Sequence, residues 1–364
     1  MNIICNVEKL KNAVSLADKM TGKTLTLPTL HALLLVASGT SLHIRATNLS
    51  VGIEVELPAK VLTEGTVLIK GDILANVCNH LSGGEVTLSL DHENLTVTTS
   101  QTTTIVKCLP PDEFPTLPDV EGDSFELKTS VLQEGIRSVY FSAAVTDIKP
   151  EIASIFIYSE GDMLVFVATD SFRLAEKKVR VKNIPEIAKI LLPYKNIADI
   201  LRVLDVGPET IRVAYSRNQL SLSGNGMYLT SRLIDGGFPP YQMILPKEEE
   251  TKVVIMKQEL LSILRLSTIF ADKFFQVIFT IDPVTKKITI SSKNTDIGSS
   301  ISTLDGVIEG NPIEVVFNLK YFLDVFQALA GDSIVMSFTK ENKPIIVRSV
   351  QDQSFLYLLM PANR

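Results

Sequence analysis

Apolar residues recur with the 3.6-residue period of an amphipathic helix in six segments of the chain. Outside these segments, short runs alternate apolar and polar residues, which is typical of strands with one buried face. Asn318 opens the last helical pattern, where an asparagine side chain is a favourable N-cap. The predicted helices span residues 6–14, 71–81, 130–143, 193–204, 257–271 and 318–329.

The helices come in pairs, and each pair belongs to one copy of an internal repeat. A glycine and an alternating run follow the second helix of each pair, at intervals of 124 residues: Gly83, Gly207 and Gly331. A Phe-Pro pair recurs at the same interval, at Phe114 and Phe238. Coincident landmarks of this kind indicate three modules, which we place at residues 1–121, 122–246 and 247–364. Because two helices can cover only one face of the strands in a module, we predict an α+β fold with antiparallel sheets.

Composition limits the class of protein. The 364 residues are 45% apolar and 21% charged, which is ordinary for a globular protein. A net charge of -6 argues against a generally basic protein that coats nucleic acid. The three cysteines are too widely spaced for a disulfide framework, and no apolar run reaches the ~20 residues that span a bilayer. With no signal-peptide pattern at residues 1–9, we expect a soluble, cytoplasmic protein.

Candidate catalytic chemistry is sparse. The chain has no Gly-rich phosphate loop, no H-E-x-x-H and no G-x-S-x-G, and its four histidines are not grouped at metal-ligand spacing. We therefore expect no metal, no cofactor and no enzymatic activity. Asp170, within residues 168–175, is the most catalytic-looking acid. Asp and Ser both favour tight turns, so a turn between two strands is the favoured interpretation of this residue.

The polar faces of the predicted helices carry both signs of charge, with a modest excess of lysine and arginine. An ordinary solvated surface explains such a face. A weak, sequence-independent contact with phosphates explains it as well, because that contact needs cations but no base-reading geometry. The sequence leaves both interpretations open.

Residues 168–175 read Ala-Thr-Asp-Ser-Phe-Arg-Leu-Ala, and this segment resembles the T-D-x-x-R-L-A motif of bacterial DNA polymerase III beta subunits, the replication sliding clamps. Phe172 stands where the family often has His. Five further matches follow the family's order and spacing: T-L-P at 26–28, L-P-x-x-x-F-P at 109–115, D-G-x-F-P-x-Y at 235–241, N-x-x-Y at 318–321 and Y-x-x-M-P at 357–361.

The resemblance implies a head-to-tail homodimer in which six modules close a ring, with twelve helices lining its hole. Such a ring encircles double-stranded DNA without reading its sequence and acts as a processivity factor. It implies partners that bind through short hydrophobic motifs: the replicative polymerase alpha subunit, the clamp loader, other polymerases and repair proteins. Neither a membrane nor a cofactor is implied.

The resemblance also places a peptide-binding pocket between the second and third modules. Core packing of a last strand is an equally simple interpretation of Leu358 and Met360, and both interpretations can hold together. Met243 stands where some family members carry Arg, and the chain ends in Ala-Asn-Arg instead of a more apolar sequence. The implied pocket residues are Ile152, Thr169, Ser171, Phe172, Arg173, Leu174, Pro239, Met243, Ile244, Asn318, Tyr321, Leu358, Met360 and Pro361.

Two further sets of residues follow from the resemblance. The DNA-facing residues would be Lys23, Lys149, Lys195 and Arg202. The dimer interface would join Val77 and Val106 of the first module to Ile269 and Phe270 of the third. Two other functions stay open: a three-module interaction scaffold that does not load on DNA, and a hydrolase that uses Asp170.

Overall fold

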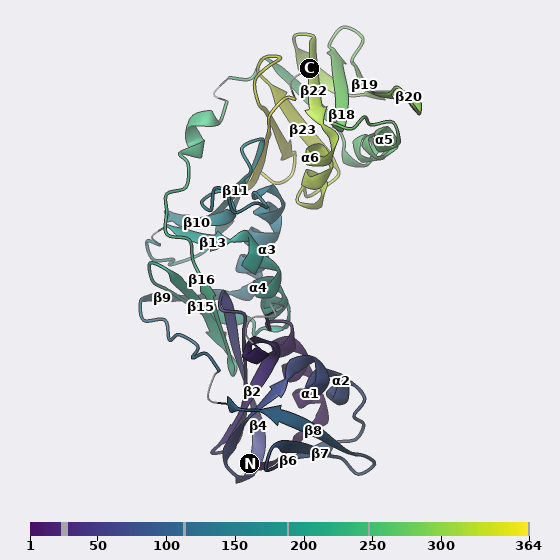
Figure 1. The fold of residues 1–364 in the computed structure, drawn as a ribbon. Helices are drawn as coiled ribbons and strands as arrows, with labels where there is room; N and C mark the ends of the chain where they lie inside the picture. The colour runs from purple at the N-terminus through teal and green to yellow at the C-terminus, as the bar shows by residue number, and fades with distance from the viewer. Residues whose placement is uncertain (23–27, 112–113, 188, 247, 363–364) are drawn as a thin grey trace. The chain divides into compact units, whose positions relative to one another are not determined.

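A computed structural model describes residues 1–22, 28–111, 114–187, 189–246 and 248–362 of the chain (Figure 1). Each predicted helix has a counterpart in this part of the chain. The α-helices are α1 (Val7–Asp18), α2 (Gly71–Asn79), α3 (Thr129–Val139), α4 (Tyr194–Val206), α5 (Lys257–Ile269) and α6 (Leu319–Asp324). Short 3-10 turns are η1 (Pro28–His31), η3 (Tyr140–Ser142), η4 (Tyr241–Ile244) and η5 (Val325–Gln327).

The helix ends differ from the predicted ones where local geometry tightens. The predicted helix 130–143 is α-helical only to Val139 and ends in the 3-10 turn η3. The predicted helix 318–329 is shorter still, because α6 passes into η5 after Asp324. Asn318 is the N-cap of α6, as predicted. Its side-chain oxygen accepts hydrogen bonds from the backbone N–H groups of Lys320 and Tyr321, two and three residues ahead.

The first compact unit comprises residues 1–133 and 195–233. Its strands form one twelve-stranded sheet in the order β1-β6-β7-β8-β5-β2-β3-β4-β16-β15-β14-β9, and β1 also pairs with β4. The strands are β1 (Asn2–Asn6), β2 (Ala32–Ser38), β3 (Ser41–Thr47), β4 (Val51–Thr63), β5 (Gly65–Lys70), β6 (Glu85–Asp91), β7 (Asn94–Thr98), β8 (Thr103–Leu109), β9 (Asp123–Lys128), β14 (Thr210–Tyr215), β15 (Gln219–Gly224) and β16 (Met227–Arg232).

The second compact unit comprises residues 134–194 and 234–364. It holds a nine-stranded sheet, β13-β10-β11-β12-β25-β24-β23-β17-β21, and a four-stranded sheet, β20-β19-β18-β22. The strands are β10 (Ser154–Glu160), β11 (Met163–Thr169), β12 (Arg173–Arg180), β13 (Ile190–Pro193), β17 (Thr251–Met256), β18 (Gln276–Asp282), β19 (Lys287–Asn294), β20 (Gly298–Asp305), β21 (Val307–Gly310), β22 (Ile313–Asn318), β23 (Ser333–Phe338), β24 (Ile345–Ser349) and β25 (Phe355–Leu359).

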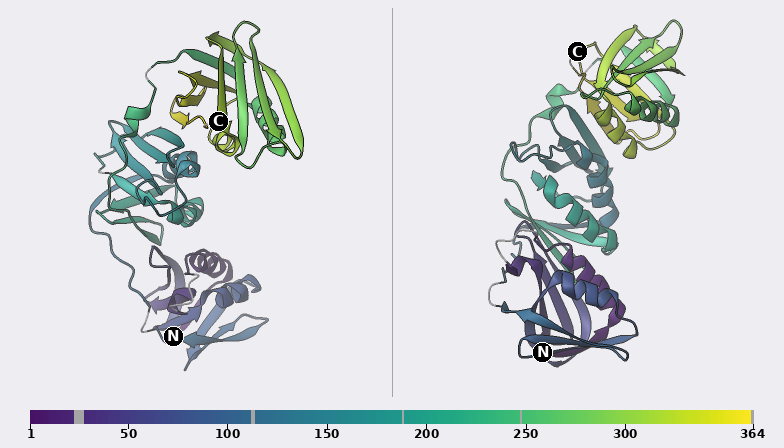
Figure 2. Two further views of the ribbon diagram at one scale, coloured as in Figure 1. Left: turned by 45° about the horizontal axis from the view of Figure 1, so that its top comes forward. Right: turned by 45° about the vertical axis from the view of Figure 1, so that its right-hand side comes forward.

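Helices pack on the sheets within each unit. In the first, α1 and α2 lie side by side against the strands of the first module, as both views in Figure 2 show. The apolar face of α1 buries Leu10 and Val14 completely. In the second, α5 packs on α6 and on β19 and β20. The strand pairings among the described residues are antiparallel, which confirms the predicted α+β class.

The sheets continue from one predicted module into the next. Strand β4 of the first module pairs with β16 of the middle one, and β12 of the middle module pairs with β25 of the last. The two compact units therefore do not follow the expected borders after residues 121 and 246, since the middle module contributes strands to both units. Where the module borders lie stays a prediction.

Candidate functional site

The site is built around the tight turn that joins β11 to β12. Thr169 donates its hydroxyl proton to the carbonyl oxygen of Arg173 (2.6 Å), while its oxygen accepts the N–H of Ser171 (3.1 Å). Asp170 Oδ1 accepts two backbone N–H groups, from Phe172 (2.9 Å) and Arg173 (3.0 Å). Ser171 takes the left-handed conformation at φ 78°. The Thr-Asp pair of the sequence motif is therefore a turn former, as predicted for Asp170.

The same turn fixes a buried guanidinium. Arg173 Nε lies 2.9 Å from Asp170 Oδ2, and Arg173 also pairs with Asp324 at the end of α6. Only 10% of the Arg173 side chain is exposed. Burial lowers the pKa of Arg173, but the hydrogen bond that Arg173 donates to Asp324 and the charges of both aspartates outweigh burial and raise this pKa above its ordinary value. Arg173 is therefore a permanent cation that holds the turn and α6 together.

Aromatic rings cover this ion-pair cluster. The guanidinium carbon of Arg173 lies 4.5 Å from the centroid of the Tyr321 ring. Phe172 stacks on the same ring at 6.2 Å between centroids and is 59% exposed. Burial, followed by the charge of Asp170, raises the pKa of Tyr321, so its phenol stays neutral. The result is an exposed aromatic platform with a fixed support.

The last strand brings the carboxyl-terminal residues to this platform. Strand β25 pairs with β12 in a register that places Leu359 opposite Arg173. One residue further on, the N–H of Met360 donates to the carbonyl oxygen of Phe172 (2.9 Å). The N–H of Ala362 donates to Val316 on β22 (2.8 Å). The segment 360–362 is thus held by backbone hydrogen bonds that leave its side chains available to line a surface.

A cavity of about 450 Å³ opens at this place in the second unit. Its predicted lining residues are Phe172, Asn318, Tyr321, Met360 and Pro361. Sequence reasoning missed Phe274, Gln276 and Ala362, which complete the wall. Phe274 is 60% exposed. Its backbone is held by Asp272, whose Oδ1 accepts the N–H groups of Phe274 (3.0 Å) and Gln276 (3.1 Å). Two consecutive phenylalanines directly before a strand were the available signal.

Other residues implied by the resemblance lie outside the cavity wall. Leu174 and Leu358 are buried in the apolar cluster on which Met360 packs, which fits core packing, and their part in peptide binding stays a prediction. Thr169 and Ile152 are also buried, and Ser171 stays in the turn. The remaining implied residues belong to the segment before and within η4, where Met243 and Ile244 are 81% and 51% exposed and Pro239 is exposed: they do not line this cavity.

The residues expected to face DNA differ in exposure and in ion pairing. Lys149 and Lys195 are exposed, Lys195 in the first turn of α4. Arg202, further along α4, is paired with Asp199 at 2.6 Å, so part of its charge is compensated. Lys23 lies outside the described residues. Each of these contacts stays a prediction.

The residues expected at a dimer interface also differ in exposure. Val77 and Phe270 are partly buried, and Ile269 is 61% exposed. Val106 is only 8% exposed because its side chain packs inside its own unit. The adjacent Ile105 is 66% exposed and presents the apolar surface that Val106 cannot.

Among the described residues, no three His, Cys, Asp or Glu side chains are grouped so that they could hold a metal ion. In the same part of the chain, no helix is long and apolar enough to cross a membrane. Asp170, the acid singled out from the sequence, uses both carboxylate oxygens within its own turn.

Comparison with protein families covers nearly the whole chain. Residues 1–118 match the model of the N-terminal domain of the DNA polymerase III beta subunit, 126–240 that of its central domain, and 242–363 that of its C-terminal domain. The chain belongs to the DNA polymerase III beta subunit family. The family membership suggested by the sequence motifs is thereby confirmed, and so is a fold of three clamp-type modules.

Relatives of known name agree along the full length. A beta sliding clamp of Synechocystis sp. is 27% identical, and the match covers 100% of this chain and 99% of that protein. The crystal structure of the beta subunit of Thermotoga maritima superposes with a TM-score of 0.93 at 27% identity, covering 100% of this chain and 99% of the other. The Pseudomonas aeruginosa beta subunit has a TM-score of 0.95 at 22% identity over 100% of both chains, a likeness of fold.

Proposed function

We propose that the chain is the processivity factor of a bacterial DNA polymerase III, a non-catalytic sliding clamp that encircles duplex DNA in the cytoplasm. The observation that carries this proposal is the unbroken succession of three beta-subunit domains along the chain. Relatives that match over the full length are named beta sliding clamps. Both carboxylate oxygens of Asp170, the acid most suggestive of catalysis, form hydrogen bonds within its own turn, which argues against the hydrolase alternative.

A head-to-tail homodimer would form by pairing of two edge strands. Strand β8 pairs with β5 only through Cys108 and Leu109, so one edge of residues 103–107 is open. Strand β20 forms an edge of the four-stranded sheet. Ile105 on β8 and Ile301 on β20 are 66% and 73% exposed, which is unusual on an unprotected edge. Pairing β8 of one copy with β20 of the next would cover both, and such a heterologous contact closes when its rotation completes a ring.

Contact with DNA would be weak and independent of sequence. Topological enclosure holds a ring on DNA without strong phosphate binding, and strong binding would oppose sliding. The exposed Lys149 and Lys195 supply cations suited to transient phosphate contacts. Arg202 would contribute less than either lysine, because Asp199 already neutralises part of its charge.

Partner proteins would dock at the cavity beside the aromatic platform. Its volume of about 450 Å³ lies within the ~300–1,000 Å³ typical of ligand sites. Phe172, Tyr321, Phe274 and Met360 give it apolar walls, and Asn318 and Gln276 give it polar groups. This composition suits a short peptide with one or two apolar anchor residues. A polymerase or the clamp loader that carries such a peptide would be tethered to the ring.

Loading on circular DNA tests the function directly. The chain is incubated with its clamp loader, ATP and nicked circular duplex, and clamp retained on the DNA is separated by gel filtration. We expect retention on the circle and release when the circle is cut, because a sliding ring leaves through a free end. A chain that dimerises but is never retained on the circle would instead be the interaction scaffold.

Double charge reversal of Lys149 and Lys195 tests the DNA contacts in the same assay. We expect less loading and a weaker dependence of loading on salt, since each lost phosphate contact removes roughly 0.9 from the slope against log salt. Reversal of Lys182, an exposed lysine outside α4, is the matched control. Equal losses for the control and for the double variant would contradict the assignment.

A further inference from the structure

The tight turn of the peptide site has a second copy in the first compact unit, between β3 and β4. Thr47 Oγ1 donates to the carbonyl oxygen of Val51 (2.9 Å) and accepts the N–H of Leu49 (3.0 Å). Asn48 Oδ1 accepts the N–H groups of Ser50 (3.0 Å) and Val51 (2.8 Å). Leu49 takes the left-handed conformation at φ 70°, as Ser171 does at φ 78°. Asn48 therefore does for this turn what Asp170 does for the other, but without a charge.

The strand beside the turn is also placed equivalently. Val51 pairs with Ser231 on β16, just as Arg173 pairs with Leu359 on β25. The N–H of Arg232 then donates to the carbonyl oxygen of Ser50 at 2.9 Å, the distance at which Met360 donates to Phe172. In its backbone hydrogen bonds, Arg232 therefore occupies at the second turn the position that Met360 occupies at the first, and Ser50 occupies the position of Phe172.

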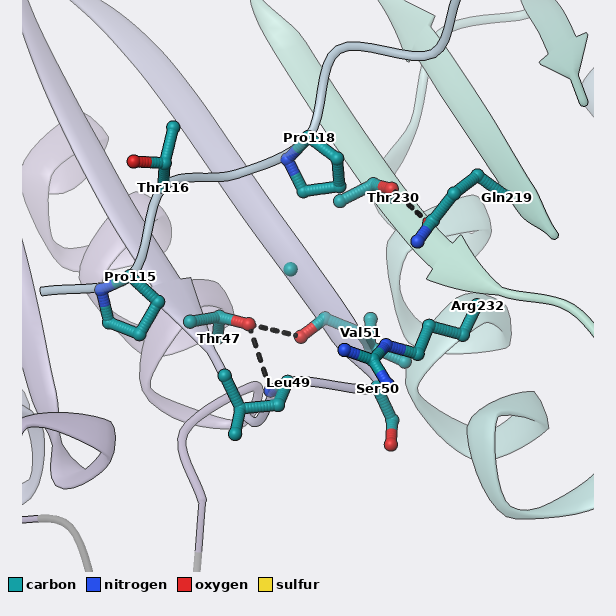
Figure 3. A pocket seen from close by; sticks show the side chains of 11 residues that line it. Thr47, Leu49, Ser50, Val51, Pro115, Thr116, Pro118, Gln219, Thr230 and Arg232 are labelled. Carbon is teal, nitrogen blue, oxygen red and sulfur yellow. Dashed lines mark hydrogen bonds between the residues drawn. The ribbon is translucent and has the colours of Figure 1, made fainter.

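A cavity of about 240 Å³ lies at this second turn, wholly within the first unit (Figure 3). The segment 115–118 runs over the sheet here, so closely that a Cβ on Gly52 would come within 2.4 Å of the Leu117 side chain. In Figure 3, Gln219 and Arg232 lie on one side of the cavity and Pro115 on the other. Its wall is therefore part apolar loop and part polar strand.

Arg232 and Gln219 supply hydrogen-bond donors on the polar side of this cavity. No carboxylate is among the described lining residues. In the described part of the chain, Arg232 has no ion-pair partner, whereas Arg173 has two. The cation also stands at a different place in the two sites, since Val51 takes the position of Arg173 and Arg232 that of Met360. Gln219 uses its side-chain oxygen to accept the hydroxyl proton of Thr230 (3.3 Å), and among the described residues its NH₂ group has no hydrogen-bond acceptor and can donate to a ligand.

We propose that this cavity is a second docking site, which binds a carboxylate side chain on an extended peptide segment of a partner protein. Arg232 would pair with the carboxylate, and the NH₂ group of Gln219 would hydrogen-bond to it. Leu49, which is 43% exposed, and the rings of Pro115 and Pro118 would cover an apolar neighbour in the peptide. A volume of about 240 Å³ is below the ~300 Å³ at which drug-sized ligand sites begin, so the site takes one or two residues. This site is additional to the proposed partner cavity and goes beyond the proposed function.

Titration of the full-length chain with matched peptides tests the proposal. The probe is acetyl-Leu-Glu-Leu-amide, its control is acetyl-Leu-Gln-Leu-amide, and binding is measured calorimetrically at low salt. We expect saturable binding of the acidic peptide and about tenfold weaker binding of the amide control, the loss typical of one charge-assisted hydrogen bond. Arg232→Gln should weaken binding of the acidic peptide by a similar factor.

Arg212→Gln is the matched control variant. Arg212 is exposed on β14 of the same sheet, bonded to Ser124 and outside the cavity, so its loss should leave binding unchanged. Unfolding curves of both variants that match that of the unmodified chain establish that neither has lost its fold.

Three results would overturn the proposal: no saturable binding of the acidic peptide, equal binding by Arg232→Gln, or equal loss in Arg212→Gln. A further titration uses sodium glutarate alone. If glutarate binds as tightly as the peptide, the site takes a small free carboxylate, and the inference of a docked peptide is wrong.

Discussion

Met360→Arg is the substitution that most sharply tests the proposed partner cavity. Met360 is half-buried at the end of β25, where it packs on the apolar cluster of the second unit and lines the cavity. Its backbone N–H bonds to Phe172, and this bond does not depend on the side chain. Arginine would therefore keep the strand in place while putting a charged guanidinium into the space that an apolar anchor needs.

The expected magnitude follows from the burial of that anchor. A leucine or phenylalanine side chain taken fully out of water contributes about 1.5–3 kcal/mol. Losing one such anchor corresponds to a Kd raised about 10- to 150-fold, at 1.4 kcal/mol for each factor of ten. The aromatic platform of Phe172 and Tyr321 stays in place, because Arg173 and its two aspartates support it from below.

Fluorescence anisotropy of a labelled short peptide ending in Leu-Phe measures this Kd. Met256→Arg is the matched control, because Met256 is 47% exposed at the end of β17 and does not line the cavity. Met243→Arg, on the other exposed turn η4, should change the Kd less than about threefold. An unchanged Kd for Met360→Arg, with the dimer intact by sedimentation, would refute the reasoning. Lost binding in Met243→Arg would extend the site to η4.

Three further predictions concern the turn, the acid stability and the dimer. Asp170→Ala should lower the free energy of unfolding in urea by about 3 kcal/mol, because it leaves a buried guanidinium short of a partner; a loss below 1 kcal/mol would contradict this. Burial raises the pKa of Asp352, but hydrogen bonds from a neighbouring serine and Lys177 outweigh it and lower this pKa. The stabilisation is therefore complete above the unfolded pKa of about 3.9 and is lost as the pH falls through the lower folded value. Asp352→Asn should remove that part of the acid dependence of unfolding, and an unaltered pH profile would count against it. Ile105→Asp or Ile301→Lys should each shift the chain to monomer in equilibrium sedimentation at micromolar concentration, whereas persistent dimers would exclude the proposed edge pairing.

The sequence predicts much of the fold because most helices and turns depend on residues close to one another in the chain. The helical segments carry an apolar stripe that must pack on a sheet, and the 124-residue interval of their flanking glycines indicates three copies of one module. The role of Asp170 was readable for the same reason, since an aspartate bonds to backbone N–H groups two and three residues ahead. The termination of α6 after Asp324 was not readable, because a 3-10 turn continues its apolar pattern.

The partner cavity could be predicted only in part. Phe172, Tyr321 and Met360 were implied by motifs, but Phe274 and Gln276 enter through the pairing of β18 with β22, which places Gln276 opposite Asn318. Gln276 and Asn318 are 42 residues apart in the chain. The register between their strands is set by packing and by the turn at Asp272, so no local sequence pattern predicts it.

By itself, the sequence determined the module, its repetition and the family, because each depends on residues near one another in the chain or on motifs in a fixed order. The tertiary structure decided which side chains share a wall. The two turns have the same hydrogen bonds, but different residues lie beside them. Strand β25 brings Met360 to the turn between β11 and β12, and β16 brings Arg232 to the turn between β3 and β4; both strands come from far along the chain. That pairing gives one cavity an apolar methionine and the other a cation with no ion-pair partner in the part of the chain that the structure describes, because strand register decides which residues are neighbours across a sheet.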